Sequence, residues 1–315
     1  MPKDPIYKGL GDVLGGIPLD SIQPRDGITT KVDLATLTSY NLLPKQRKTI
    51  VVPGSPSIWR PPNTPRKVKA DAGKYQMDPN RHVFPKCSLE PLFRALSLTQ
   101  PNMKLNDIDL VTDRRNLRLL LGFVSTRQPK AVRNSLTHNR IIRYMFGDVK
   151  IIMRYEVDGC TGSDKDIRTA MPISEVQRTP TGYTVLKCGQ LVSPSRIIEI
   201  KTGAAGKNLV ISKNTEQLWF SQTPFLCAGH YDEVGNFTSI TKKNHLKLGT
   251  LQKWENSHQE QLKKLATLLR VIVELAKAAA WKKFALVSSE NTLKVFGLTN
   301  QNDKGLPVDL HSMWE

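Results

Sequence analysis

Cysteine is scarce in this chain, and it is not arranged for cross-linking or for zinc binding. The 315 residues contain four cysteines, Cys87, Cys160, Cys188 and Cys227, which lie far apart in the sequence. No CxxC pair occurs, and no cysteine and histidine residues have the spacing of a zinc site. These absences exclude a disulfide-stapled secreted module and a zinc finger. We expect four unpaired thiols in a reducing compartment.

Long apolar runs are also missing. The N-terminal segment from Met1 to Pro5 and beyond lacks the apolar core of a secretory signal. No stretch has the length of a membrane span without charges. The sequence therefore predicts an intracellular protein with no membrane association.

Acidic residues are few in comparison with basic ones. The 28 Asp and Glu residues face 46 Lys and Arg residues, which gives a formal net charge of +18. A field of this sign attracts polyanions, and nucleic acid is the commonest polyanion inside a cell. An anionic membrane surface is the other candidate, but no basic amphipathic anchor or lipidation signal supports it. We therefore expect RNA or DNA as a partner.

The composition divides the chain into three parts. Residues 1–85 are rich in proline, glycine and polar residues, and we expect an irregular extension with loops there. Residues 86–297 carry the patterns of a folded domain, and residues 298–315 are predicted to be a C-terminal tail. Residues 53–69 form a basic, proline-rich segment, which is either a solvated loop or a contact to phosphates. As a weak nuclear address, this segment favours the nucleus over the cytoplasm.

Helical patterns occur at two places in the folded part. Residues 88–124 read as helices, with Ser88 as a capping residue and leucines at helical spacing in the second half. The strongest helix is predicted over residues 257–284, where seven apolar residues form one stripe.

Strand patterns fill the region between these helices. A hairpin is predicted around the turn at Gly147 and Asp148, and residues 159–181 are expected to be a polar surface excursion. The predicted strands are residues 140–146, 149–154, 182–186 and 196–200, with a closing hairpin over residues 284–296. This order predicts an α+β fold with a central mixed β-sheet flanked by helices.

Two short acidic clusters end two of these strands. Side chains alternate between the faces of a strand, so Glu156 and Asp158 share one face. By the same rule, Glu199 and Lys201 share a face of the later strand. If the two strands are neighbours, three carboxylates and one ammonium group converge on one point.

Such a point suits a hard divalent cation. Mg²⁺ prefers oxygen ligands, and a lysine beside it holds a phosphate or orients a water molecule. An acid in one strand followed by E-x-K in a later one is the arrangement of PD-(D/E)xK-type nucleases. The alternative is an ordinary exposed sheet face, since E-x-K also arises by chance.

The stretch from Ile152 to Phe237 resembles the DXO-type RNA 5′-end decapping nucleases. In that family an E-x-D motif and an E-x-K motif bind the catalytic metals, and a W-x-Q-S-F-L-like motif follows, with a downstream glycine. The matching segments here are Glu156–Asp158, Glu199–Lys201, Trp219–Leu226 and Gly229. Upstream, Asp109–Arg114 resembles that family's helix near the start of the nuclease core. The resemblance implies a PD-(D/E)xK-type fold.

The chain is also similar, over roughly residues 30–297, to a group of fungal proteins that carry the label geranylgeranyl pyrophosphate synthetase. Segments such as Arg154–Gly159, Gly189–Val192 and Trp254–Asn256 carry this similarity. Prenyl-transferring enzymes hold diphosphate through Mg²⁺ bound to DDxxD motifs on facing helices. No DDxxD occurs in this chain, and the central region reads as strand, so the residues exclude that activity.

The resemblance implies a role for each site residue. Asp158 and Glu199 bind Mg²⁺ or Mn²⁺ with help from the Ile200 carbonyl, while Glu156 binds a second metal ion or positions the attacking water. Lys201 stabilises the phosphate or orients that water. The expected reaction is hydrolysis at an RNA 5′ end, either decapping and pyrophosphate hydrolysis or exonuclease cleavage.

Three further residues are candidates for substrate binding. His138 and Arg140 precede the first acidic cluster and are expected to contact a terminal phosphate, with structural packing an equal alternative for His138. Gln222 is expected to touch the substrate, although its motif is two residues longer than in the family. Trp219 and Phe225 are expected to be core residues rather than surfaces on which bases stack.

One departure from the family keeps a second interpretation open. DXO-type enzymes carry a further glutamate in a G-x-x-x-E motif before the E-x-D strand, whereas residues 122–152 contain no glutamate. The alternative is thus a catalytically inactive nuclease-fold protein that binds RNA or assists a 5′–3′ exonuclease partner. A metal-dependent DNA nuclease of the same fold is a third possibility.

Overall fold

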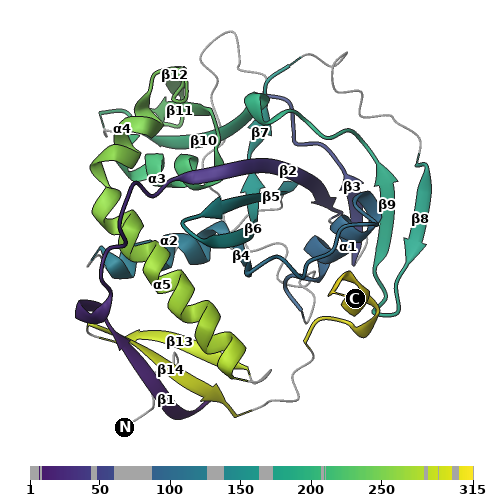
Figure 1. Cartoon of the computed structure of the whole chain (residues 1–315). Coiled ribbons are helices and arrows are strands. Elements are labelled where there is room, and N and C mark those ends of the chain that lie inside the picture. The colour runs from purple at the N-terminus through teal and green to yellow at the C-terminus, as the bar shows by residue number, and fades with distance from the viewer. Residues whose placement is uncertain are drawn as a thin grey trace.

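The computed structural model describes most of the chain and contains three β-sheets and five α-helices in the described part (Figure 1). The described residues are 7, 9–43, 48–59, 87–125, 138–162, 173–206, 209, 211–279, 283–289, 291–299 and 305–314. Residues 60–69 of the basic segment, residues 163–172 of the expected excursion and residues 126–137 of the glutamate-free region lie outside them. No helix of the described part is long and apolar enough to cross a membrane.

The largest sheet has seven strands in the order β4-β6-β5-β2-β3-β9-β8. Their bounds are β2 Lys31–Leu42, β3 Thr49–Pro53, β4 Leu110–Asp113, β5 His138–Phe146, β6 Val149–Val157, β8 Glu175–Arg178 and β9 Thr184–Cys188. β4 pairs with β6 and β3 with β9 in parallel, and the other pairs are antiparallel. The sheet is therefore mixed, as predicted, and the β5–β6 hairpin turns at Gly147, whose φ of 62° suits glycine.

The second sheet has four strands in the order β12-β11-β10-β7. Their bounds are β7 Gly159–Cys160, β10 Ile197–Ala204, β11 Phe225–Tyr231 and β12 Phe237–Asn244. β7 follows β6 after a single residue and pairs with the start of β10. The end of the large sheet is thus joined to the beginning of β10.

The N-terminal segment is more regular than its composition predicts, which is a correction. β1 (Leu10–Pro18) pairs with β14 (Thr292–Leu298), and β14 pairs with β13 (Phe284–Ser289) in the third sheet. β2 and β3 belong to the large sheet. Apart from the short β2–β3 pairing, these strands pair with segments far away in the sequence, so local composition does not reveal them. The 284–296 hairpin is confirmed.

The predicted helices differ from the observed ones at their ends, and two observed helices, Ile211–Ser221 and Thr250–Ser257, were not predicted. The bounds are α1 Glu90–Thr99, α2 Arg114–Val124, α3 Ile211–Ser221, α4 Thr250–Ser257 and α5 Gln259–Ala278. Residues 110–113, predicted as helix, form β4 because they pair with β6. Leu89 rather than Ser88 precedes the first turn of α1, without a side-chain cap. The expected excursion contains β7 and β8.

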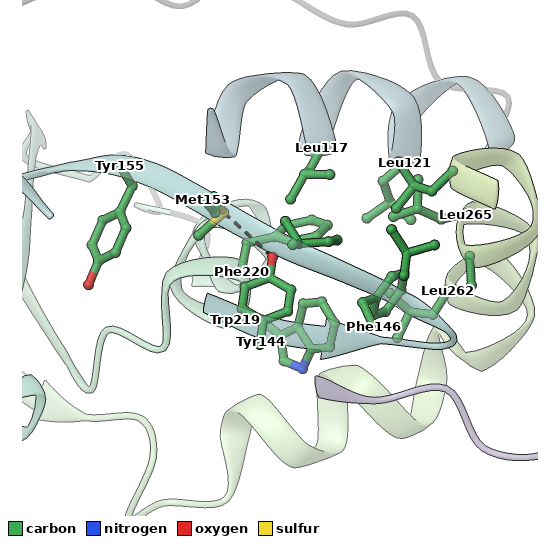
Figure 2. Packing of buried hydrophobic residues seen from close by; sticks show 14 of the residues in the cluster. Leu117, Leu121, Tyr144, Phe146, Met153, Tyr155, Trp219, Phe220, Leu262 and Leu265 are labelled. Carbon is green, nitrogen blue, oxygen red and sulfur yellow. Dashed lines mark hydrogen bonds between the residues drawn. The ribbon is translucent and has the colours of Figure 1, made fainter. Parts of the chain in front are cut away.

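Two hydrophobic clusters cover the two faces of the large sheet. One contains leucines of α1 with Ile141 and Ile152 of the sheet. The other contains residues of α2, α3 and α5 against the opposite face of β5 and β6. Figure 2 shows Trp219 and Phe220 beside Tyr144 in this second cluster, with Leu262 on α5 nearby. Trp219 is only 1% exposed and belongs to the core, as predicted, while Phe225 is half-buried.

The C-terminal residues are anchored rather than forming a loose tail. The 3₁₀ helix η4 (Val308–Trp314) buries Leu310 and Met313 in the cluster around α1. Arg94 of α1 is buried and forms ion pairs with Glu90, at 3.0 Å, and with Asp309. This charged cluster joins η4 to α1.

Replacement of Arg94 by alanine should lower the free energy of unfolding by about 3 kcal/mol, because it leaves the buried Glu90 carboxylate without its cation. Urea denaturation measures the change. The control is Arg115→Ala on the exposed side of α2, which should change stability by less than about 0.5 kcal/mol. Equal midpoints for the two variants would contradict the expected role of Arg94.

Candidate functional site

Asp158 and Glu199 lie next to each other where β6 ends and β10 begins. In the β7–β10 ladder, Gly159 pairs with Ile198, so one further step of the register brings Asp158 opposite Glu199. The Oδ2 atom of Asp158 accepts a hydrogen bond of 2.7 Å from the backbone N–H of Ile200. The expectation that the two acidic strands meet is therefore met through β7, although β6 and β10 belong to different sheets.

The Glu199 carboxylate is buried and surrounded by hydrogen-bond donors. It is 3% exposed and accepts hydrogen bonds from the Lys201 ammonium and from the Gln217 side-chain amide. Nη1 of Arg114 lies 3.6 Å from its other oxygen. Glu199 and Lys201 share a face of β10, as strand alternation predicts, and they are in direct contact.

The electrostatic state of Asp158 follows from this crowding. Burial and the neighbouring charge of Glu199 raise the pKa of the Asp158 carboxyl to about 6. The Ile200 N–H, Lys201 and Arg114 act in the opposite direction and only partly offset these effects. Two adjacent carboxylates with one raised pKa form a site where added positive charge is stabilising.

Glu156 is half-buried on β6, where it pairs with Asn139 of β5. Within the described part of the chain, no group of three or more His, Cys, Asp and Glu side chains is spaced to hold a metal ion. The contacts thus bring together two of the three expected carboxylates. The Ile200 amide is bound to Asp158, and a metal contact of the Ile200 carbonyl stays a prediction.

The residues present fit one divalent cation of the hard type. Mg²⁺ keeps several water ligands and is commonly held by one or two carboxylates together with substrate phosphates. The Asp158–Glu199 pair supplies two carboxylates, and burial followed by the charge of Glu199 raises the pKa of Asp158, so a bound cation would favour the ionised form of its carboxyl.

Arg114 and Gln217 are site residues that the sequence-based expectations missed. Arg114 is the first residue of α2, where it donates to Ser221 Oγ at 3.2 Å and lies over the Tyr155 ring, 5.5 Å from its centroid. Gln217 and Ser221 lie four residues apart on α3 and therefore share a helix face. That spacing beside the W-x-Q-S-F-L-like motif was the available signal.

A family assignment follows from the sequence as a whole. Residues 16–137 and 124–314 match the family model described as Domain of unknown function (DUF8563). The chain belongs to this family. No curated protein matches the sequence.

Several solved structures share the fold of this DUF8563 chain. Rai1 from Candida albicans, solved in complex with pU5-Mn2+, has 13% identity and a TM-score of 0.63, with 95% of this chain and 98% of that chain covered. Rai1 from Scheffersomyces stipitis, solved with (3'-NADP)+ and a calcium ion, has 10% identity and a TM-score of 0.61 over 96% and 99%. Rai1 from S. pombe, solved with 3'-FADP, has 11% identity and a TM-score of 0.56 over 90% and 99%.

These likenesses confirm the predicted α+β nuclease fold and the predicted resemblance at the level of the fold. At identities of 10 to 13%, they say nothing by themselves about the activity of this DUF8563 chain.

The position of Gln222 differs from the expectation. It follows α3 with a φ of 52°, and both its backbone N–H and its side-chain amide donate to the Trp219 carbonyl at 3.2 Å. Gln222 is therefore folded back onto the end of its own helix. The side chain of α3 that contacts the acidic pair is Gln217.

His138 and Arg140 are interior residues, so the structure does not present them to a terminal phosphate. His138 is 5% exposed, its Nδ1 lies 3.1 Å from Asn41 Oδ1, and burial followed by the charge of Arg140 lowers its pKa to about 3. It is thus neutral at pH 7. Arg140 is 0% exposed and donates to the Val192 carbonyl at 2.7 Å. Both residues therefore act inside the fold, and for His138 structural packing is the role that its burial supports.

Proposed function

We propose that this protein is a metal-dependent hydrolase that acts on RNA 5′ ends, as a decapping pyrophosphohydrolase or an exonuclease. The observation that carries the proposal is the buried Asp158–Glu199 pair, held with Lys201 and Arg114 where β6 and β10 meet. The fold supports it, because the C. albicans Rai1 with the same fold was solved in complex with pU5-Mn2+.

Asp158 and Glu199 would hold Mg²⁺ or Mn²⁺, with the Ile200 carbonyl as a further oxygen. When bound, such an ion lowers the pKa of water and neutralises charge on a phosphate. Glu156, which is half-buried on the strand that leads to Asp158, would position the attacking water. No third protein carboxylate is required, since phosphates of the substrate complete such sites.

Two cations of this chain would bind the phosphate itself. Lys201 has a side chain that is 29% exposed, so its ammonium group is open to a ligand while it contacts Glu199. Arg114, 12% exposed, offers a planar fork of donors beside the same carboxylate. Their charges would stabilise the negative charge that develops on the phosphate during hydrolysis.

The proposal is tested with a panel of RNA and DNA oligonucleotides that carry monophosphate, triphosphate or capped 5′ ends. We expect release of 5′ products from RNA in the presence of Mn²⁺, and no release after chelation. Equal cleavage of DNA would favour a DNA nuclease of the same fold. Absence of cleavage on every end, with and without Mn²⁺, would refute the hydrolase proposal.

The Lys201→Met variant should lose about 100-fold in the rate of cleavage at saturating RNA, because it removes one preorganised donor to the phosphate. Lys243→Met on the exposed face of β12 is the matched control, and it should keep the rate within about twofold. Single-turnover kinetics measures both variants. Retention of the wild-type rate by Lys201→Met would remove lysine from the proposed chemistry.

A second function is favoured by one specific observation. Glu199 already contacts Lys201, Gln217 and Arg114, which together neutralise its charge. A site of this kind also suits a catalytically inactive protein that binds RNA, alone or for a 5′–3′ exonuclease partner. Salt-sensitive RNA affinity without turnover would support this function.

A further inference from the structure

Arg140 is a fully buried cation that ties three segments of the chain together. It lies on β5, is 0% exposed, and donates from Nη1 to the Val192 carbonyl at 2.7 Å. Its Nη2 donates to Thr36 Oγ1 on β2 at 3.1 Å. On β6, Tyr155 is directly opposite Arg140 in the ladder, and its hydroxyl is a hydrogen-bond partner of the same guanidinium.

Two of these three segments lead directly into the acidic pair. Tyr155 precedes Asp158 by three residues, at the end of β6. Its ring lies under the Arg114 guanidinium, and Nη1 of Arg114 lies 3.6 Å from the Glu199 carboxylate. Figure 2 shows the Tyr155 hydroxyl pointing away from Trp219 and Phe220. Thr36 belongs to a strand that supplies no residue of the site.

Val192 lies on the segment that enters β10. Between Val192 and β10, the backbone passes through Arg196, whose carbonyl accepts a hydrogen bond of 2.7 Å from the N–H of Thr161. Nε of Arg196 donates in turn to the Thr161 carbonyl at 2.6 Å. The entry to β10 is therefore fixed at Val192 by Arg140 and, next to β7, by Arg196.

The burial of Arg140 is costly, which argues for a role beyond packing. Among the described residues, no carboxylate lies within ion-pair distance of Arg140, and its Nε has no hydrogen-bond partner there. A buried charge without a counter-ion is unfavourable, and an apolar side chain of similar volume would often stabilise a fold as well or better. What an apolar side chain lacks is the ability to bind Tyr155 and Val192 at the same time.

We propose that Arg140 is a positioning residue that sets the separation of Asp158 and Glu199. One planar guanidinium holds the strand that delivers Asp158 and the segment that delivers Glu199, so the two carboxylates keep a fixed distance. Arg140 does not touch the substrate. For its consequence in catalysis the inference rests on the proposed function, but the geometry itself is testable without metal or RNA.

The test compares two variants that each remove one hydrogen bond to the same guanidinium. Tyr155→Phe removes the link to β6 and keeps the ring beneath Arg114. Thr36→Val removes the link to β2 and is the matched control. The first readout is residue-resolved hydrogen exchange at the Ile200 amide, which reports the 2.7 Å contact with Asp158. The second readout is Mn²⁺ affinity, measured by calorimetry.

Tyr155→Phe should speed exchange at Ile200 and weaken Mn²⁺ binding by about tenfold, the usual effect of losing a group that orients a metal ligand. Thr36→Val should leave both values within about twofold. Its denaturation midpoint should nevertheless fall about as far as that of Tyr155→Phe, because each variant loses one hydrogen bond to Arg140. Unchanged values in Tyr155→Phe, or equal changes in both variants, would overturn the proposal. If the wild-type protein binds no Mn²⁺, the proposed hydrolase fails, and the exchange at Ile200 still decides the role of Arg140.

Discussion

Glu199→Gln is expected to reduce Mn²⁺-dependent cleavage of RNA by at least about 1,000-fold, because it removes a metal-binding carboxylate while the shape of the side chain is preserved. The substitution weakens metal binding in two ways. A neutral amide is a weak ligand for a hard cation, and Lys201 and Arg114 then repel the ion without a carboxylate between them.

The same variant should also be less stable. Glu199 is 3% exposed, and its loss leaves the Lys201 ammonium and the Arg114 guanidinium close together without a counter-ion. Since both cations are partly solvated, we expect a decrease in the free energy of unfolding of about 1 to 2 kcal/mol. Urea denaturation measures it, and stability then separates the loss of activity from unfolding.

The control is Glu260→Gln, which changes an exposed ion pair with Lys264 on α5. It should alter neither the cleavage rate nor the denaturation midpoint appreciably, because exposed pairs contribute about 0.5 kcal/mol or less. If Glu199→Gln cleaves RNA within about tenfold of the wild-type rate, Glu199 is not a metal ligand of the proposed reaction.

Asp158→Asn is expected to stabilise the protein at pH 7 while it abolishes metal binding. The pKa of Asp158 is about 6 in the folded protein and 3.8 in its unperturbed state, so the folded protein binds the extra proton between these values. The contribution of the neutral Asp158 carboxyl to the free energy of unfolding is therefore fully present below about pH 4. It is lost as the pH rises from 4 to 6. The loss is about 3 kcal/mol at most, at 1.36 kcal/mol for each unit of pKa.

Asparagine removes this penalty because it is neutral at every pH and still accepts the hydrogen bond from Ile200. The measurement is the free energy of unfolding at pH 4.5 and pH 7, with and without Mn²⁺. Mn²⁺ should stabilise the wild-type protein at pH 7 and leave Asp158→Asn unchanged. Asp12→Asn, at an exposed position of β1, is the control. A destabilised Asp158→Asn variant at pH 7 would contradict the assigned crowding of the two carboxylates.

The two acidic motifs were predictable because their information is local. The alternation of side chains in two strands places Glu156 with Asp158 and Glu199 with Lys201, and this pattern is visible in a few adjacent residues. Arg114 and Gln217 were missed because they come from helices. Their approach to the strand ends depends on how α2 and α3 pack on the sheets, which no short segment encodes.

The same distinction explains the fold. The β5–β6 hairpin was predicted from two β-rich runs around a glycine turn, and its register is local. β1 and β2 were not predicted, because their partners are β14 and β5, which lie about a hundred residues or more away. Arg140 was interpreted as a phosphate ligand because its burial under Val192 is likewise a property of distant segments.

The place of β2 in the large sheet has a consequence for synthesis on the ribosome. β2 lies between β5 and β3, so its longer edge has no partner until translation has passed residue 146. During that interval the nascent chain exposes an unsatisfied strand edge together with Tyr40, which is buried in the folded protein. Productive assembly of the nuclease fold therefore depends on the arrival of the β5–β6 hairpin, and chaperone dependence should be greatest before that hairpin emerges.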